Sequence, residues 1–199
     1  IIKFTDLYKA NKFKAKNIHK TIIGGISNLI KNNSFVGGKE VLNFENNFAK
    51  FTNSKYCIGV GNGTDALEIA IESLNLKKGS EVIVPTNTWI STAEAVTRSG
   101  LKVVFCDISL KDYTIDIDDL KKKISKKTSA IMVVHLYGYP ADLKKIKRIT
   151  DKRKIKIIED CAQAHGSKIE NQHVGTFGDI GTFSFFPGKN LGAYGDGGG

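Results

Sequence analysis

The sequence predicts an α/β fold in which a mostly parallel sheet carries helices on both faces. Short apolar runs of strand length alternate with amphipathic segments of helical length, and this alternation is typical of βαβ units. The run Ile131-Met-Val-Val134 is continuously apolar, as expected for a strand buried on both faces. With 199 residues, 41% of them hydrophobic, the chain is long enough to bury the core of one such domain.

The apolar periodicity assigns the elements in order. Near the start of the chain, helices are expected at residues 18–30 and 41–51, with a turn at residues 35–38, although Gly24-Gly25 weakens the first helix. Strands are then expected at residues 56–60, 81–84, 102–106, 130–135, 155–158 and 180–185. Helices are expected at residues 64–74, 90–98, 117–124 and 141–151. We therefore expect an N-terminal arm or helix over residues 1–34 and one large domain over residues 35–199.

The composition disfavours several classes of protein. The formal charge is +10, but the lysines are spread along predicted helices with few aromatic residues among them, which disfavours a nucleic-acid surface. The three cysteines lack the spacing of a zinc site or a disulfide framework and fit a reducing cytoplasm. No signal peptide or membrane-length apolar run is evident. Because the chain lacks an initiator methionine and stops after a glycine-rich loop, we expect a fragment of a longer protein. From the charge distribution, the cysteines and the short apolar runs, we expect a cytoplasmic protein that binds neither nucleic acid nor membrane.

Polar or glycine-rich segments follow five of the predicted strands. These segments are residues 61–64, 86–89, 135–138, 160–165 and 184–189. In parallel α/β sheets, ligands bind beyond the carboxyl ends of the strands. We therefore expect the five segments to converge on one rim, which is the candidate site.

The segment Gly59-Val-Gly-Asn-Gly-Thr64 follows a predicted strand and opens a helix. Its glycines allow close backbone approach, and the helix N-terminus favours an anion such as phosphate. A dinucleotide fold would place an acidic residue at the end of the next strand, which instead ends Val84-Pro85-Thr86. This disfavours an oxidoreductase and leaves two alternatives, a phosphate-bearing cofactor without adenosine or a simple turn capped by Thr64.

Three further residues offer the chemistry of a cofactor site. Asp160 ends a strand, where a carboxylate in a dry pocket needs a cation such as a pyridinium nitrogen; a helix cap or structural ion pair is the alternative. Lys189 lies in a loop of proline and glycine, where desolvation or a nearby cation lowers a lysine pKa and creates a nucleophile. Trp89, the only tryptophan, either stacks on a planar ring or packs in the core.

A metal site is not indicated. His135, His165 and His173, together with Asp107 and Asp160, match no metal-binding template. Because loose matches of this kind are frequent without any ion, we expect no metal.

An ordered series of motifs runs through nearly the whole chain. The longest are Asn62-Gly-Thr-Asp-Ala-Leu67, Glu159-Asp-Cys-Ala-Gln-Ala-His-Gly166 and Phe183-Ser-Phe-Phe-Pro-Gly-Lys-Asn-Leu-Gly-Ala-Tyr-Gly-Asp-Gly-Gly198. Together they resemble the DegT/DnrJ/StrS family of sugar-nucleotide aminotransferases, which depend on pyridoxal 5′-phosphate (PLP). The resemblance implies the large domain of the aspartate aminotransferase-like fold (fold type I), truncated here and without its small C-terminal domain.

The resemblance also implies a role for each matched residue. Lys189 holds PLP as a Schiff base and later moves the substrate proton, and Asp160 pairs with the pyridinium nitrogen. Gln163 lies near the phenolic oxygen, and Trp89 stacks on the ring. The phosphate is cradled by Gly63, Thr64, Asp65 and Ser184. PLP supplies the difficult chemistry, while the protein orients it and tunes its electronics.

The implied reaction moves an amino group from a donor, glutamate in the first instance, to a keto-sugar nucleotide. The loop around Lys189 is most similar to members that act on dTDP-linked 3-keto-6-deoxyhexoses, in deoxyaminosugar and surface-glycan biosynthesis. Related dehydratases carry histidine in place of Lys189, so lysine favours transamination. Family members are homodimers that share residues between subunits. The alternatives are another fold-type-I PLP lysine enzyme, such as a desulfurase or aldolase, and a non-catalytic regulatory protein on the same scaffold.

Overall fold

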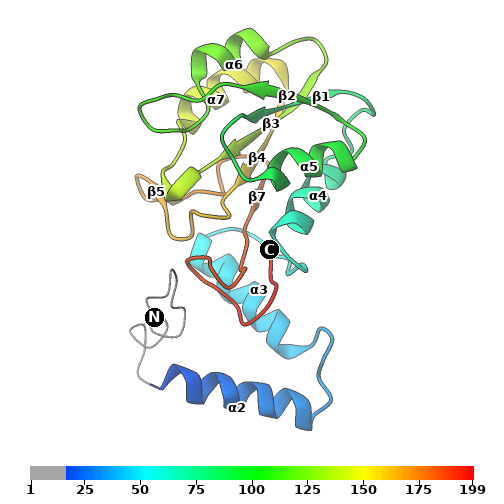
Figure 1. Cartoon of the computed structure of the whole chain (residues 1–199), viewed down its shortest axis with the longest axis vertical. Coiled ribbons are helices and arrows are strands. Elements are labelled where there is room, and N and C mark those ends of the chain that lie inside the picture. Colours follow the sequence, from blue (N-terminus) through cyan, green and yellow to red (C-terminus); the bar gives the residue numbers. More distant parts are fainter. Residues whose placement is uncertain (1–16) are drawn as a thin grey trace, which may run out of the picture.

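A parallel five-stranded sheet forms the centre of the molecule in a computed structural model that describes residues 17–199 (Figure 1). The strand order is β2-β1-β3-β4-β7, and each neighbouring pair is parallel. The strands are β1 (Glu81–Pro85), β2 (Lys102–Cys106), β3 (Thr128–Val134), β4 (Lys156–Asp160) and β7 (Ile180–Thr182). A short antiparallel hairpin, β5 (Lys168–Ile169) and β6 (Gln172–His173), lies between β4 and β7 in the sequence. The predicted α/β architecture is confirmed.

Helices cover both faces of the sheet (Figure 1). One face carries α4 (Gly63–Ser73) and α5 (Ile90–Arg98), and the other carries α6 (Ile117–Lys123) and α7 (Leu143–Thr150). Two 3-10 turns follow β3 and α7, η1 (Leu136–Gly138) and η2 (Asp151–Arg153). Because strand side chains alternate between faces, Ile83 of β1 packs with α6 and α7, whereas Val82 and Val84 pack with α4 and α5. The strands are continuously apolar in the sequence because both of their faces are covered by helices.

Two helices precede the sheet. In α3 (Lys39–Thr52), Phe48 is buried against Phe183 and Phe185, with ring centroids 4.9 and 5.1 Å apart. By contrast, α2 (Ile18–Lys31) has no buried residue and lies at the end of the molecule away from the sheet (Figure 1). Residues 1–16 of the predicted N-terminal arm lie outside the described residues, so the boundary between residues 34 and 35 stays a prediction. Among the described residues, no helix has the length and apolar character needed to cross a membrane.

The strand predicted at residues 56–60 is wrong. These residues make a single antiparallel bridge, from Val60 to Gly198, and the side chains of Tyr56 and Ile58 are exposed. A strand needs a neighbour along its length with which to exchange hydrogen bonds, and within residues 17–199 the only β-bridge of this segment is the one to Gly198. The last predicted strand is shorter than expected for a related reason, because Phe183 exchanges its backbone hydrogen bonds with Gly199 rather than with β4.

Candidate active site

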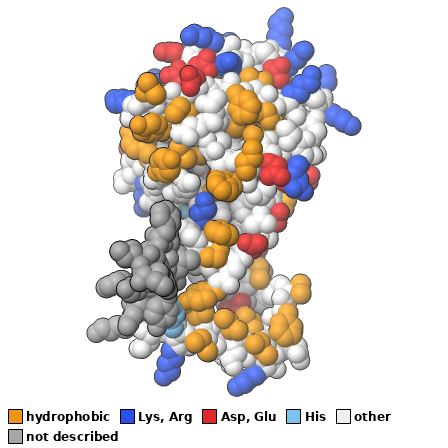
Figure 2. All heavy atoms as spheres, in the orientation of Figure 1, with side chains coloured by type: hydrophobic (Ala, Val, Ile, Leu, Met, Phe, Trp, Pro, Cys, Tyr) orange, Lys and Arg blue, Asp and Glu red, His pale blue; other side chains and the backbone are white. Residues whose placement is uncertain are grey.

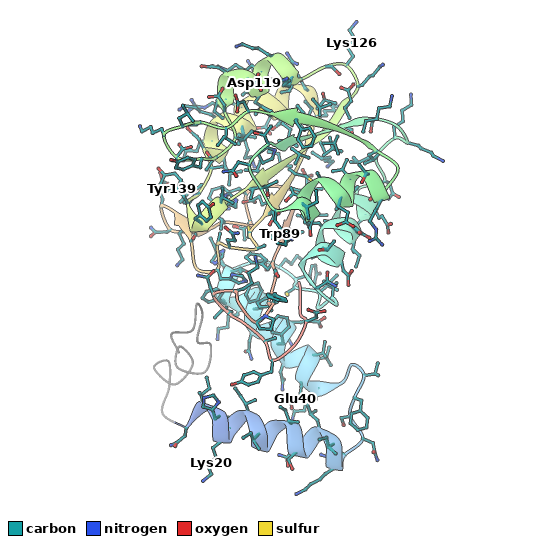
Figure 3. The ribbon with its side chains drawn as sticks, viewed as in Figure 1. Lys20, Glu40, Trp89, Asp119, Lys126 and Tyr139 are labelled. Atoms are coloured by element: carbon teal, nitrogen blue, oxygen red, sulfur yellow. The ribbon has the colours of Figure 1, made fainter. Side chains whose placement is uncertain are left out.

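The five predicted segments converge along the carboxyl edge of the sheet. Two hydrogen bonds join residues 135–138 to residues 160–165: the N–H of His135 donates to the carbonyl of Asp160 (3.0 Å), and the N–H of Tyr137 donates to Gln163 Oε1 (2.8 Å). Thr64 Oγ1 donates to Ser91 Oγ (2.8 Å), in the helix that follows residues 86–89. Trp89 lies on the side of the sheet that faces α3, whereas Lys126 lies at the opposite end (Figure 3). The predicted rim is therefore present, and its residues come from β1, β3, β4, β7 and the start of α4.

The start of α4 is in close contact with Ser184. A Cβ atom added to Gly63 would lie 2.6 Å from the Cβ of Ser184, so only glycine fits here. Asn62 caps the helix, since its Oδ1 accepts from the N–H of Asp65 (2.9 Å) and its Nδ2 donates to the Asp65 carboxylate (3.2 Å). Within residues 17–199, the N–H groups of Gly63 and Thr64 meet no acceptor. Together with the helix dipole and the Ser184 hydroxyl, they suit a phosphate.

Asp160 is a buried carboxylate at the end of β4, with 5% of its surface exposed. Its Oδ2 accepts from the Thr92 hydroxyl (2.9 Å) and its Oδ1 from the N–H of Ala162 (3.1 Å). Burial raises the pKa of Asp160, and this outweighs the lowering by Ala162, by Thr92 and by the nearby positive charge of Lys189. A carboxylate in this position is stabilised by a cation, so the site is suited to a protonated nitrogen.

Lys189 is carried by a tightly closed loop. The N–H of Ala193 donates to the carbonyl of Phe185 (2.8 Å), and the N–H of Lys189 donates to the carbonyl of Phe186 (2.8 Å). A Cβ atom on Gly192 would lie 2.2 Å from the carbonyl oxygen of Pro187, which explains the glycine at that position. The loop thus holds Lys189 near enough to Asp160 for its charge to act on that carboxylate.

The remaining two predicted residues also reach the rim. Gln163 lies three positions after Asp160, and its side-chain Oε1 accepts from the N–H of Tyr137 (2.8 Å). Trp89 immediately precedes α5 and is 71% exposed. Core packing, the alternative for Trp89 in the sequence, is therefore excluded.

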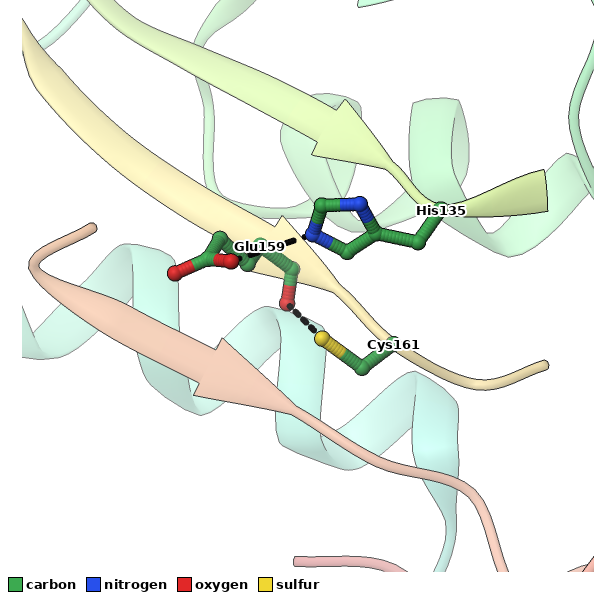
Figure 4. Close-up of side chains that lie close together, drawn as sticks. All are labelled: His135, Glu159 and Cys161. Atoms are coloured by element: carbon green, nitrogen blue, oxygen red, sulfur yellow. Dashed lines mark hydrogen bonds and ion pairs between the residues drawn. The ribbon is translucent and has the colours of Figure 1, made fainter. Parts of the chain in front are cut away.

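A second buried carboxylate, Glu159, precedes Asp160 in β4, so its side chain lies on the opposite face of the sheet. Figure 4 shows Glu159 with His135 and Cys161. It accepts a hydrogen bond from Nε2 of His135 (3.0 Å), whose Nδ1 in turn accepts from the N–H of Ala141 (3.1 Å). Three backbone N–H groups also donate to Glu159, from Gly175, Phe177 and Gly178. Burial raises the pKa of Glu159, but the hydrogen bond and charge of His135 and the backbone donors bring it below its usual value.

His135, Glu159 and Cys161 place their potential ligand atoms within 4.8 Å of one another. The geometry nevertheless assigns them to the core, because both carboxylate oxygens and both imidazole nitrogens already have hydrogen-bond partners. Burial also raises the pKa of the Cys161 thiol well above 9.0, which disfavours the thiolate that a metal requires. Its thiol donates weakly to the carbonyl of Glu159 instead (3.8 Å; Figure 4).

The first turn of α5 and the segment just before it supply contacts that the sequence did not identify. Ser91 contacts Thr64, Thr92 contacts Asp160, and Thr88 contacts Thr92 at 2.8 Å. The available signal was the spacing of Thr88 and Thr92, which places two hydroxyls one turn apart directly after a strand end.

The fold and the candidate site together define a class of protein: a fold-type-I α/β protein in which the carboxyl edge of the sheet suits a phosphate-bearing group. The chain belongs to the DegT/DnrJ/EryC1/StrS aminotransferase family, whose model matches residues 16–199. This confirms the predicted family, and pyridoxal phosphate is the cofactor of that family.

Two curated relatives are sugar-nucleotide aminotransferases. UDP-N-acetyl-3-dehydro-alpha-D-glucosamine 3-aminotransferase of Acidithiobacillus ferrooxidans is 46% identical over 177 residues, which cover 89% of this chain and 48% of the relative. dTDP-3-amino-3,6-dideoxy-alpha-D-galactopyranose transaminase of Aneurinibacillus thermoaerophilus is 43% identical over 185 residues, covering 93% and 50%. The chain thus spans about half the length of the curated relatives it matches.

Solved structures agree with this assignment. S. venezuelae DesV in complex with a ketimine intermediate has a TM-score of 0.92 and 35% identity, covering 99% of this chain and 52% of the other. The E. coli GDP-4-keto-6-deoxy-D-mannose-3-dehydratase with bound hydrated PLP has a TM-score of 0.83 and 33% identity, covering 99% and 49%. The predicted fold type I is therefore confirmed.

Proposed function

We propose that the full-length protein is a PLP-dependent aminotransferase that transfers an amino group to the keto group of a nucleotide-linked sugar. The observation that carries this proposal is the placement of Lys189 and Asp160 on one rim, next to the free N–H groups of Gly63 and Thr64. A nucleophilic amine, a buried carboxylate that needs a cation and a phosphate-binding helix start are the three features that PLP requires. The residues present therefore fit the cofactor.

Each rim residue has a task in this proposal. Gly63, Thr64 and Ser184 bind the phosphate through two N–H groups and a hydroxyl, and Asp65 contributes by completing the cap that orders the helix start. Asp160 holds a proton on the ring nitrogen, and Trp89 covers the ring. The bound cofactor acts as an electron sink for the carbon that loses its proton.

Lys189 has two tasks. Its amine binds the cofactor covalently at rest, and the released amine then moves a proton at the substrate carbon. Gln163 donates from its amide to the phenolic oxygen, because its own oxygen is already bound to Tyr137.

We further propose the substrate. The two curated relatives are named for amino groups at position 3 of a nucleotide-linked hexose, and the chain is similar to both. A 3-keto hexose is therefore the favoured acceptor, a dTDP-linked 6-deoxy sugar being the first to test and a UDP-linked sugar the second. The amino donor is glutamate, and the product serves deoxyaminosugar and surface-glycan biosynthesis.

The protein is proposed to act as a homodimer in the cytoplasm. Exposed apolar side chains gather on α2 and the segment that follows it, among them Ile23, Ile30, Phe35 and Val36 (Figure 2). An apolar surface of this kind is typical of an interface, and a second copy would cover it. The three cysteines are all free, which fits a reducing compartment.

Absorption spectroscopy on the full-length protein tests the proposed function. With PLP, the protein should show the visible band of a protonated Schiff base, and glutamate should bleach that band towards the pyridoxamine form. Product analysis with dTDP- and UDP-linked keto sugars then identifies the acceptor. A visible band that no amino donor changes would favour a non-transaminase, such as a desulfurase, an aldolase or a regulatory protein. A light-scattering mass of one subunit would contradict the homodimer.

A further inference from the structure

Thr88 and Thr92 form a directed chain of hydroxyl groups that ends on Asp160. Thr92 Oγ1 lies 2.9 Å from Oδ2 of Asp160 and 2.8 Å from Oγ1 of Thr88. A hydroxyl has one proton, and Thr92 gives it to the carboxylate. Thr88 must therefore be the donor in its bond to Thr92. The direction of the chain is thus fixed, from the partly exposed Thr88 through the fully buried Thr92 to Asp160.

The chain fixes the orientation of the Asp160 carboxylate and favours its charged form. One oxygen is bound by Thr92 and the other by the N–H of Ala162, so rotation of the carboxylate would break both bonds. The Thr92 hydroxyl and the N–H of Ala162 both donate to the carboxylate, and hydrogen bonds of this kind favour the ionised form of Asp160. Each carboxylate oxygen keeps a further lone pair for another donor. The Asp160 carboxylate can therefore accept a hydrogen bond from one further N–H group without changing its orientation.

We propose that Thr92, supported by Thr88, is a positioning residue that keeps Asp160 ionised and oriented towards the ring nitrogen of PLP. This inference rests on the proposed function, since it assigns the partner of Asp160. Neither threonine touches the cofactor in this role. Thr92 acts on the ring nitrogen only through the carboxylate.

Five influences of known sign act on the pKa of the Asp160 carboxylate. Burial raises the pKa of Asp160, whereas the hydrogen bonds from Ala162 and Thr92 lower it. The titratable groups that face Asp160 are His135 at the end of β3 and Lys189 after β7, and both also lower its pKa. Loss of the Thr92 hydroxyl removes one lowering influence. The acidic limb of the pH profile, where Asp160 takes up a proton, should therefore move to higher pH in Thr92→Val.

The decisive experiment compares two cofactors on the full-length protein. PLP carries the ring nitrogen, and 1-deaza-PLP replaces it with a C–H group that Asp160 cannot bind. The dissociation constant of each is measured by titrating the apoprotein, and their ratio reports the contact between Asp160 and the nitrogen. Thr92→Val keeps the side-chain shape and removes the donor, and Thr92→Ser keeps the donor.

In wild-type protein, the dissociation constant of the deaza analogue should exceed that of PLP, and this ratio is the preference for PLP. Thr92→Val should lower the ratio by about 10-fold or more, as expected for a lost hydrogen bond to a charged group. Thr92→Ser should keep most of the preference, and Thr88→Val should narrow it less than Thr92→Val. Thr97→Val is the matched control, because this exposed threonine of α5 bonds only to the carbonyl of Glu94, and the preference should not change.

The outcomes separate the two proposals. If Thr92→Val weakens both cofactors equally, Thr92 is merely structural and the inference is overturned, while the proposed function stands. If wild-type protein binds PLP no better than the deaza analogue, Asp160 does not contact the ring nitrogen, and the assigned role of Asp160 fails as well. If Thr92→Val does not fold, an unchanged preference in Thr88→Val overturns the inference.

Discussion

The backbone N–H of Tyr137 donates a 2.8 Å hydrogen bond to the side-chain oxygen of Gln163, and this contact fixes which way the amide faces. An N–H group can only donate, so the amide oxygen lies towards Tyr137 and the NH₂ group remains available to donate elsewhere. Tyr137 has a φ of 54°, in the left-handed region that large side chains rarely adopt. The turn after β3 therefore holds a strained residue at the point where it orients Gln163.

Gln163→Glu tests the direction of this amide. The carboxylate still accepts from the N–H of Tyr137, but it offers no donor to the phenolic oxygen of the cofactor. Two negatively charged oxygens then face each other, so PLP binding should weaken by about 10-fold or more. The checks are the dissociation constant and the pH titration of the visible band. Equal affinity and an unchanged titration in the variant would show that Gln163 does not donate to the cofactor.

Asp160→Asn removes the charge that holds a proton on the ring nitrogen while keeping the size of the side chain. The rate of the reaction with glutamate should fall by about 100-fold or more, as is typical when one preorganised electrostatic partner is lost. In the unchanged protein, the same rate should fall as the pH drops through the raised pKa of Asp160, because the carboxylate must be ionised. Rapid-mixing spectroscopy measures both effects. Asp151→Asn, at an exposed position, is the control.

Gly63→Ala should impair binding of the cofactor phosphate. The new Cβ would lie 2.6 Å from the Cβ of Ser184, so the helix start and the Ser184 backbone must separate. The affinity for PLP should fall, and added inorganic phosphate should compete less well than in the unchanged protein. Gly25→Ala is the matched control, since a Cβ there meets no atom within 4 Å and alanine favours a helix by about 0.5–1 kcal/mol. Unchanged PLP affinity in Gly63→Ala would remove this glycine from the phosphate site.

Glu159→Ala should destabilise the fold by about 3–5 kcal/mol, because it leaves His135 and three backbone N–H groups buried without their acceptor. Urea unfolding measures the loss. The pKa of Glu159 is lowered in the fold, so its contribution is present above the unfolded value of 4.5 and is lost as the pH falls through the lower folded pKa. A difference in stability between the two proteins that stays constant down to acidic pH would contradict this account.

Elements with a strong local pattern could be predicted from the sequence. Residues 90–98 and 102–106 were predicted with the bounds that the structure shows for α5 and β2, since their apolar spacing reflects the face they bury. Residues 56–60 have an equally apolar pattern but form no strand. Strand formation depends on a neighbour, and neighbours are set by tertiary structure rather than by local sequence.

The candidate site also has features that the sequence predicts and features that depend on tertiary structure. Asp160 and Lys189 follow predicted strands that the parallel sheet contains, so their convergence on one rim follows from parallel topology. The start of α4 follows residues 56–60, which form no strand, and an antiparallel bridge from Val60 to Gly198 holds the segment before it. Contacts between distant segments could not be predicted, because nothing local links residues such as Thr92 and Asp160, which lie 68 positions apart. The domain boundary and the individual roles of the rim residues stay predictions.

Chemical trapping of the cofactor tests the central claim most directly. The full-length protein is incubated with PLP, reduced with borohydride so that any Schiff base becomes a stable bond, and digested for mass spectrometry. The account predicts a pyridoxyl group on Lys189 and, in Lys189→Ala, loss of both the label and the visible band, whereas the exposed Lys152→Ala keeps both. A label on another lysine, or a visible band that survives in Lys189→Ala, would contradict the account.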